Sequence, residues 1–349
     1  MLKIGPIELD VPFVQAALSG YSDLPMRRLA RRYGAPYAIN EVVLDKFVTH
    51  HGKKRRGILD VPDDDHPVGG QLMGSNPDDF APAAVAMADG GYDVIDINYG
   101  CPVKKVLGRC RGGFLLSQPD TALEIIRRVY EAVFDRCPVT VKMRRAMDDT
   151  PEARRDFFTI LDGAFDIGIA AITVHGRTVA QRYVGRSDWS FLAEVKRHVG
   201  DRVILGSGDL FSAQACVRMI RETGVDGVTI ARGCIGNPWI FRDCRALWNG
   251  EPLPPPPSIG EQREALEGHL ADMIETRGEH MSGKLMRRFG IKYSEHHPES
   301  RKVRDAFIHV SKPEDIRALL KRWYDPTADW PPVRRRQSHG DLIAAGATA

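Results

Sequence analysis

Eight short apolar segments, separated by longer amphipathic ones, constrain the fold of this sequence more than any other feature. The short segments are mostly continuous apolar runs, which is typical of parallel strands covered on both faces. The longer segments carry apolar residues at three- and four-residue spacing, which predicts helices such as Pro77–Asp89 and Thr121–Phe134. The predicted strands are Phe13–Leu18, Tyr37–Val43, Val68–Leu72, Val94–Asn98, Val139–Met143, Ala171–Val174, Val203–Leu205 and Gly227–Ile230.

Eight such units within about 230 residues predict an α/β fold of the TIM (β/α)8 barrel type. The alternative is an open doubly wound sheet. That fold would place a Gly-rich fingerprint after the first strand and an acidic residue about 20 residues later. The first turn reads Ser19-Gly20-Tyr21-Ser22-Asp23, which is not that pattern, so the barrel is favoured.

A second domain follows the barrel. Four consecutive prolines, Pro254–Pro257, form a stiff linker that the interior of a helix or strand does not tolerate. Apolar stripes at helical spacing follow, in Leu266–Ile274 and Ile316–Trp323, and predict a small all-helical bundle. The predicted organisation is a barrel domain over 1–250, a helical domain over 258–325 and a disordered tail over 326–349.

Composition limits the class of protein. The 349 residues are 43% hydrophobic and contain neither a membrane-length apolar stretch nor an apolar N-terminal signal, so we expect a cytoplasmic protein without a membrane partner. We also expect a monomer. None of the six cysteines forms a metal-binding spacing, so we expect no metal. The net charge is only +3, but local basic clusters favour a polyanionic partner. These clusters are Lys53–Arg56, Lys104–Lys105 with Arg109 and Arg111, and Lys284 with Arg287 and Arg288.

Polar and Gly-rich groups follow seven of the eight predicted strands, at the barrel end where TIM barrels carry their chemistry. Amides and a lysine suit the polar edge of a flavin. Gly-rich turns after the last two strands suit a phosphate, with Arg232 adding charge. Each side chain alone also fits a structural role, but the set together predicts a bound cofactor. The groups include Asn40-Glu41, Gln71, Asp96–Pro102, Lys142–Arg144, His175–Arg177, Ser207–Asp209 and Ala231–Gly233.

Four motifs at these strand ends resemble those of the tRNA-dihydrouridine synthases. The most specific is Asp96-Ile-Asn-Tyr-Gly-Cys-Pro-Val-Lys-Lys-Val106, followed by Thr173-Val-His-Gly-Arg-Thr178. Val141–Arg144 and Gly233–Trp239 match as well, and the resemblance covers residues 11–325 in the same order. The bacterial-type members of this family combine an FMN-holding barrel with a small C-terminal helical domain.

The resemblance implies an activity. Members of the family reduce uridines of the tRNA D-loop to dihydrouridine with FMN and NADPH. A hydride passes from FMN N5 to uracil C6, and a cysteine, here Cys101, protonates C5. The implied FMN ligands are Ala16, Ala17, Leu18, Gln71, Lys142, His175, Ser207, Gly208, Asp209, Ala231, Arg232 and Gly233. The implied substrate contacts are Asn98, Arg144 and Arg177 for the base and Lys104, Lys105, Arg287 and Arg288 for the RNA.

The chemistry of this reduction suits these residue types. The anion left after hydride addition needs an acid beside C5 and a positive group near the uracil carbonyls. A thiol is protonated at neutral pH yet can release its proton, and Arg144 keeps its charge at any accessible pH. Cys110 is the nearest competitor of Cys101, because it lies in the same basic loop.

Two other functions remain open from the residues. One is an FMN reductase of small molecules, of the dihydropyrimidine or dihydroorotate type, which would need neither the helical domain nor the basic clusters. The other is a non-catalytic tRNA-binding factor, which would need none of Cys101, Lys142 and His175.

Overall fold

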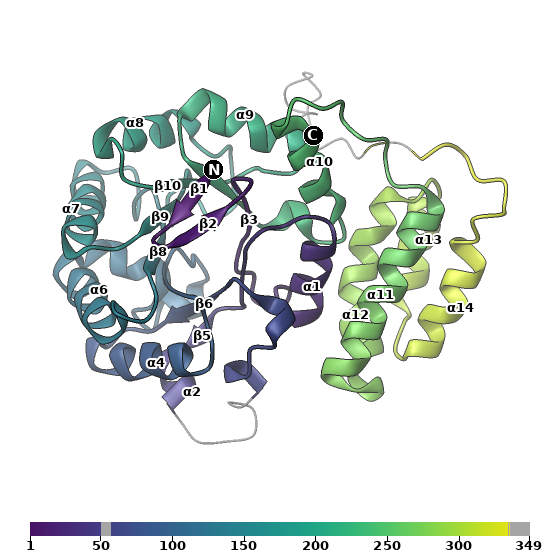
Figure 1. Ribbon diagram of the computed structural model, residues 1–349, viewed down its shortest axis with the longest axis horizontal. Helices are drawn as coiled ribbons and strands as arrows, with labels where there is room; N and C mark the ends of the chain where they lie inside the picture. The colour runs from purple at the N-terminus through teal and green to yellow at the C-terminus, as the bar shows by residue number, and fades with distance from the viewer. Residues whose placement is uncertain (50–56, 334, 336–349) are drawn as a thin grey trace. The chain divides into compact units, whose positions relative to one another are not determined.

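The computed structural model describes residues 1–49, 57–333 and 335. Within them, nine parallel strands run in the order β4-β3-β11-β10-β9-β8-β7-β6-β5, and β4 also pairs with β6, so the sheet closes into a barrel (Figure 1). The predicted TIM barrel is therefore confirmed. The strands are β3 Phe13–Gln15, β4 Ala38–Ile39, β5 Val43–Leu44, β6 Val68–Met73, β7 Val94–Tyr99, β8 Val139–Arg144, β9 Ala171–His175, β10 Ile204–Ser207 and β11 Gly227–Ile230.

The second barrel strand is interrupted by a bulge. Ile39 in β4 pairs with Gly69, whereas Val43 in β5 pairs with Leu72. Three residues therefore lie opposite two of β6. Such a bulge bends the strand and redirects its side chains, here at the polar pair Asn40-Glu41 near the carboxyl end of the barrel.

Helices surround the barrel (Figure 1). Their apolar faces are buried, as in α6, where Ile125, Ile126 and Val129 are fully enclosed. Helix α7 has a complete set of end signals. Thr150 accepts from the N–H of Ala153, and Gly168 ends the helix in the left-handed region. The helices are α2 Asp45–Thr49, α4 Pro77–Asp89, α5 Lys104–Leu107, α6 Pro119–Val133, α7 Pro151–Ile167, α8 Trp189–Val199 and α9 Ala213–Thr223.

An N-terminal hairpin, absent from the sequence prediction, covers the amino end of the barrel. Its strands, β1 Leu2–Ile4 and β2 Ile7–Leu9, pair antiparallel. The hairpin packs on residues at the start of the barrel strands, including Val94 and Ala171, in one apolar cluster. This apolar cluster lies at the amino end of the barrel, opposite to the end where the polar groups follow the strands.

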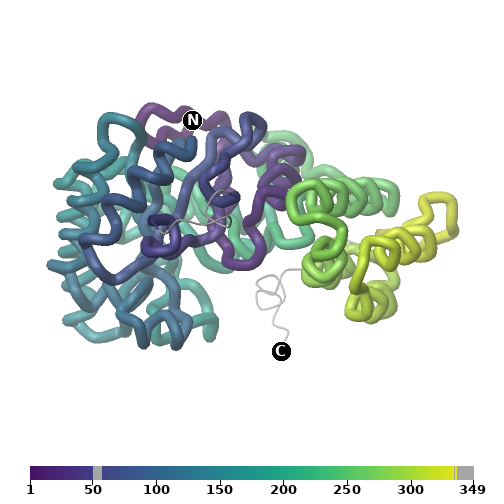
Figure 2. Tube along the Cα trace, turned by 90° about the horizontal axis from the view of Figure 1, so that it is seen from below, coloured from purple at the N-terminus to yellow at the C-terminus, as the bar shows by residue number. Residues whose placement is uncertain are grey.

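A second compact unit is helical. It comprises 21–35, 211–214 and the described residues from 232 onward. Its helices are α1 Leu24–Arg32, α10 Trp239–Trp248, α11 Ile259–Arg277, α12 Glu279–Tyr293, α13 Ser300–Ile308 and α14 Pro313–Trp323. Helices α11 to α14 lie side by side in both views (Figures 1 and 2). After the proline linker, Ser258 and Glu261 form a capping box that starts α11.

Helix α1 lies far from the other helices of this unit in sequence but packs against α11. Arg28 pairs with Glu275 at 3.1 Å, and Arg32 with Asp272 at 2.8 Å. The basic cluster Lys53–Arg56 and residues 334 and 336–349 of the predicted tail lie outside the described residues.

Candidate active site

The strand register collects polar side chains on the inner face of the barrel, toward its carboxyl end. Residues paired across parallel strands point to the same side of the sheet. Three cross-strand rows therefore share this face. They are Gln71, Asp96 and Thr140; Asn98, Lys142 and Thr173; and Arg144, His175 and Ser207. Six residues predicted from sequence are thus brought together, namely Gln71, Asn98, Lys142, Arg144, His175 and Ser207.

Asp96 lies at the base of this polar face. It was counted from the sequence among the polar groups at the strand ends but was assigned no role as a cofactor or substrate ligand. Asp96 is 1% exposed, and its carboxyl group accepts from Thr140 Oγ1 and Gln71 Nε2, each at 2.6 Å. Burial raises the pKa of Asp96, and the two hydrogen bonds and the charge of Lys142 oppose the rise. Reading β7 with a period of two would have placed Asp96 on the same face as Asn98.

Lys142 is a second titratable group whose pKa this environment changes. Burial, followed by the charge of Arg144, lowers its pKa to about 8. The charges of Asp96 and Cys101 act in the opposite direction. Such a lysine can interact with an electron-rich ligand group and changes its charge close to neutral pH.

Cys101 is held on both sides of its backbone. The side-chain oxygen of Asn98 accepts from the N–H groups of Gly100 and Cys101, at 3.0 and 3.1 Å. The carbonyl of Cys101 accepts from the N–H of Gly113 at 3.1 Å. A Cβ at Gly112 would lie 2.8 Å from the Cβ of Cys101, so only glycine fits there. Cys101 is half-buried, whereas its competitor Cys110 is exposed.

Arg144 has its guanidinium committed to backbone carbonyls. Its Nε donates to Gly100 O at 3.0 Å, and its Nη1 donates to Thr178 O and Arg182 O at 2.8 and 2.7 Å. The guanidinium also lies 5.7 Å from the ring centroid of Tyr183. Arg144 therefore ties the turn of Cys101 to the loop that follows β9. The predicted contact of Arg144 with a base stays a prediction.

Asp209 and Arg177 form an ion pair beside the turn after β10. Ser187 N also donates to Asp209, at 2.8 Å. Gly208, next to Asp209, has φ +117°, and a Cβ on it would lie 2.2 Å from Ser187 Oγ. The chain can make this turn only with glycine at 208. The sequence prediction did not include Ser187.

The remaining predicted cofactor ligands are divided between the two compact units. Ala16, Ala17 and Leu18 follow β3, where Ala16 N donates to Ile230 O at 3.0 Å. Ala231 ends the barrel unit, whereas Arg232 and Gly233 belong to the helical unit. Within the helical unit, Arg232 stacks over the ring of Phe211, 5.1 Å from its centroid.

The predicted RNA contacts differ in their environment. Lys104 and Lys105 are exposed on α5, which starts three residues after Cys101. In contrast, Arg287 Nε donates to Val310 O at 2.6 Å. Arg288 lies over the rings of Tyr21 and Phe289, at 5.3 and 5.2 Å. Two of the four predicted contacts therefore already have structural roles.

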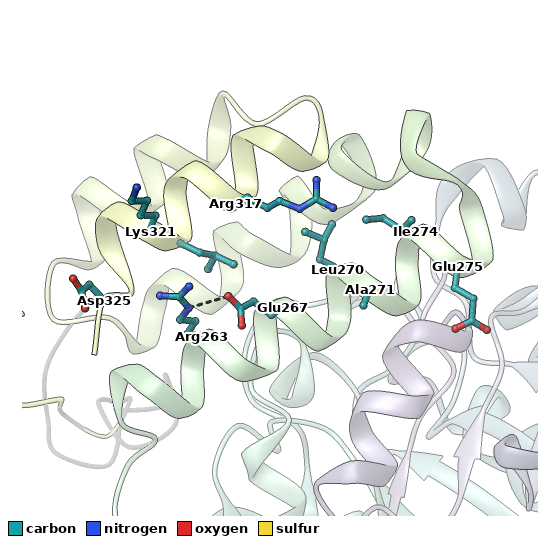
Figure 3. A pocket seen from close by; sticks show the side chains of 10 residues that line it. Arg263, Glu267, Leu270, Ala271, Ile274, Glu275, Arg317, Lys321 and Asp325 are labelled. Atoms are coloured by element: carbon teal, nitrogen blue, oxygen red, sulfur yellow. Dashed lines mark hydrogen bonds and ion pairs between the residues drawn. The ribbon is translucent and has the colours of Figure 1, made fainter. Parts of the chain in front are cut away.

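An open groove of about 950 Å³ lies on the helical unit between α11 and α14 (Figure 3). Leu270, Ala271 and Ile274 form an apolar floor, and Arg263 pairs with Glu267 at the rim. The lining contains neither a cysteine nor a histidine, so the groove lacks the residue types of the barrel site.

Membrane helices and metal clusters are both missing from the part of the chain that the structure describes. No helix among the described residues is both long and apolar enough to span a bilayer. No group of three or more His, Cys, Asp or Glu side chains in the same residues could hold a metal ion.

Comparison with known protein families shows which family this chain resembles. The model of the dihydrouridine synthase family matches residues 14–325, which is most of the chain.

This chain belongs to the dihydrouridine synthase family.

The family assignment agrees with individual relatives. The tRNA-dihydrouridine synthase B of Xanthomonas campestris pv. campestris is 33% identical over 93% of this chain and 96% of that protein. The tRNA-dihydrouridine synthase B of Pseudomonas aeruginosa is 32% identical over 99% of each. A solved histamine dehydrogenase from Rhizobium sp. 4-9 shares the fold, with a TM-score of 0.56 and 15% identity. That match covers 77% of this chain and 50% of the dehydrogenase.

The predicted membership of the dihydrouridine synthase family is thus confirmed, and so is the oxidoreductase class of the enzyme. The roles of the individual site residues stay predictions.

Proposed function

We propose that this chain is a tRNA-dihydrouridine synthase that reduces uridines of the tRNA D-loop to 5,6-dihydrouridine, with FMN as cofactor and NADPH as reductant. The observation that supports it best is Cys101, held by Asn98 beside a polar inner face that includes Lys142. A half-buried thiol next to positive charge is suited to proton donation to a developing anion. Cytoplasmic location and the monomeric state stay predictions.

The residues of the polar face fit FMN. Gln71 and Lys142 would hold the polar edge of the ring system, and His175 borders the same face. Ser207 and the turn at Gly208, which has no room for a Cβ, would hold the phosphate end. By the family resemblance, Arg232 and Gly233 are further FMN ligands in this proposal, through the charge of the arginine and a backbone N–H.

When bound, FMN would supply the hydride that uracil C6 receives, and NADPH would reduce the oxidised FMN again. Cys101 donates the thiol proton to C5, so the product gains one hydride and one proton and the cysteine becomes a thiolate. Lys142 is close enough to Cys101 for the thiolate charge to raise the lysine pKa. By the same interaction, the ammonium group of Lys142 stabilises the thiolate.

Asn98 and Arg144 border the uracil in this proposal. The Asn98 amide has a second N–H beyond the one that it donates to Gln71, and this N–H would reach a uracil carbonyl. Arg144 acts mainly through its charge, because its Nε and Nη1 bond to carbonyls. A positive charge there stabilises the anion that spreads over C5 and O4.

The target base must leave its stack to reach the inner face of the barrel, so the enzyme must also hold the RNA around it. Lys104 and Lys105, exposed a few residues after Cys101, are placed to contact phosphates.

The test is dihydrouridine formation in an unmodified tRNA transcript, with purified protein, FMN and NADPH. Wild type should form dihydrouridine, Cys101→Ala should form little, and Cys110→Ala, a matched change on the same loop, should retain activity. Mapping the product by primer extension identifies the uridine. Loss of activity in Cys110→Ala but not in Cys101→Ala would reassign the acid.

The same assay with free uridine and dihydroorotate-type substrates tests the small-molecule alternative. Turnover of these compounds without any product in tRNA would overturn the proposal. The protein could also bind tRNA but turn over no substrate, neither transcripts nor tRNA from cells. That result would favour the non-catalytic tRNA-binding factor.

A further inference from the structure

A continuous chain of side-chain hydrogen bonds leads from the buried Asp96 to the backbone of Cys101. Asp96 Oδ2 accepts from Gln71 Nε2 at 2.6 Å, and Gln71 Oε1 accepts from Asn98 Nδ2 at 2.7 Å. Asn98 Oδ1 then accepts from the N–H of Cys101 at 3.1 Å. Thr140 holds the other oxygen of Asp96 at 2.6 Å.

The direction of every bond between Cys101 and Asp96 is fixed at the backbone end. A backbone N–H only donates, so Asn98 must turn its oxygen to Cys101 and its NH2 group to Gln71. Gln71 must then turn its oxygen to Asn98 and its NH2 group to Asp96, so the network is consistent along its whole length.

We infer that Asp96 is a positioning residue, which orients the Cys101 segment through Gln71 and Asn98. An apolar residue at 96 would leave the Gln71 amide without its acceptor. Gln71 could then rotate, and Asn98 would lose the partner that directs its oxygen toward Cys101.

The burial of this network supports a positioning role over an incidental one. Asp96 and Gln71 are each 1% exposed, so water cannot replace either partner when it is removed. A carboxyl group is costly to bury, which the raised pKa of Asp96 reflects. An apolar side chain at position 96 would fit the barrel interior at a lower desolvation cost than this carboxyl group. The carboxyl group is therefore better explained by the hydrogen bonds that it accepts than by packing.

Alkylation of the two loop thiols tests the inference directly. The full chain as purified is treated with iodoacetamide, and mass spectrometry follows Cys101 and Cys110 separately. Cys110 is exposed and does not bond to Asn98, so it serves as a reference in the same molecule. In Asp96→Leu the ratio of the Cys101 rate to the Cys110 rate should rise about fivefold, equivalent to about 1 kcal/mol of lost restraint.

The conservative variant separates positioning from general damage. Asp96→Asn still offers an oxygen to Gln71 and can donate to Thr140, so its rate ratio should return to that of wild type. If Asp96→Leu does not fold, Asp96→Ser takes its place, because a serine is too short to reach Gln71. A ratio that stays within about twofold of wild type, or a rise shared equally by Cys110, overturns the inference.

A second readout rests on the proposed function. In the tRNA assay, Asp96→Leu should lower kcat with little change in KM for tRNA, and Asp96→Asn should recover much of the rate. The alkylation test needs neither tRNA nor turnover. Failure of the proposed function would therefore leave the thiol result standing, and failure of the inference would leave product formation in the wild type.

Discussion

The guanidinium Nη2 of Arg177 donates to both carboxylate oxygens of Asp209, at 2.8 and 2.7 Å. The pair joins the end of β9 to the turn after β10, and the Arg177 side chain is only 4% exposed. Arg177 also donates to Gly185 O, at 3.1 Å from Nε. Both residues were predicted from the sequence to contact a ligand. In the structure, each one holds the other in place.

The ion pair should contribute measurably to stability. Asp209→Asn retains a residue that tolerates the φ of +59° found here and removes only the charge. We expect the free energy of unfolding to fall by about 2 kcal/mol, less than the roughly 3–5 kcal/mol of a fully buried pair, because Asp209 is 22% exposed. Urea unfolding measures the change. Asp209→Ala, which adds backbone strain, should cost more, and equal costs would contradict this account.

Gly208→Ala should disrupt the turn that we assign to the phosphate. The substitution combines a strained φ of +117° with a contact of 2.2 Å to Ser187 Oγ, so we expect a loss of about 3 kcal/mol or more. Gly250→Ala is the matched control, because its φ is +79° but nothing lies within 4 Å of the added Cβ. It should cost only about 1 kcal/mol. The flavin absorbance of the purified protein should fall for Gly208→Ala and not for the control. An unchanged flavin content in Gly208→Ala would contradict the assignment of the phosphate to this turn.

The lowered pKa of Lys142 predicts a pH-dependent stability of the cofactor-free protein. Below about pH 8 the folded chain holds a protonated lysine at a desolvation cost that the unfolded chain does not bear. Lys142→Met should therefore be more stable than wild type at pH 7. Between the folded pKa of about 8 and the ordinary value of 10.5, the unfolded state binds more protons, so wild type gains stability and the difference narrows.

Urea unfolding at pH 7 and pH 10 checks this difference. Lys104→Met replaces an exposed lysine on α5 and should show no such pH dependence. A Lys142→Met variant less stable than wild type at pH 7 would mean that interactions of the ammonium group outweigh its burial.

The four predicted RNA contacts should separate into two kinds. Lys104→Ala with Lys105→Ala should weaken tRNA binding and reduce its salt dependence, by a slope of about 1 for each phosphate that the protein no longer binds, with no effect on stability. Arg288→Ala should cost about 1–2 kcal/mol of stability, because the guanidinium packs on Tyr21 and Phe289. Filter binding at several salt concentrations and thermal unfolding measure the two effects. Full tRNA affinity in the double lysine variant would remove α5 from the proposed RNA surface.

The sequence by itself determined the barrel. Continuous apolar runs such as Val94–Asn98 and Ala171–Val174 become strands buried on both faces, and Pro77–Asp89 is a helix with the predicted bounds. It also determined which residue types follow the strands, because a parallel barrel brings all carboxyl ends of its strands to one rim. Local pattern suffices for these features, since burial and periodicity act over a few neighbouring residues.

Tertiary structure alone decided which side chains bind one another. Asp96, Gln71 and Asn98 form one network only because β6 and β7 pair in a register that sets Gln71 opposite Asp96. Arg177 meets Asp209 across 32 positions of sequence. A continuous run of apolar residues does not reveal this register, because it reads the same on both faces of the strand. A shift of one residue would nevertheless turn every side chain to the other face. The barrel could therefore be predicted from its pattern, whereas the partners of Cys101 depended on strands that pair only when the barrel closes.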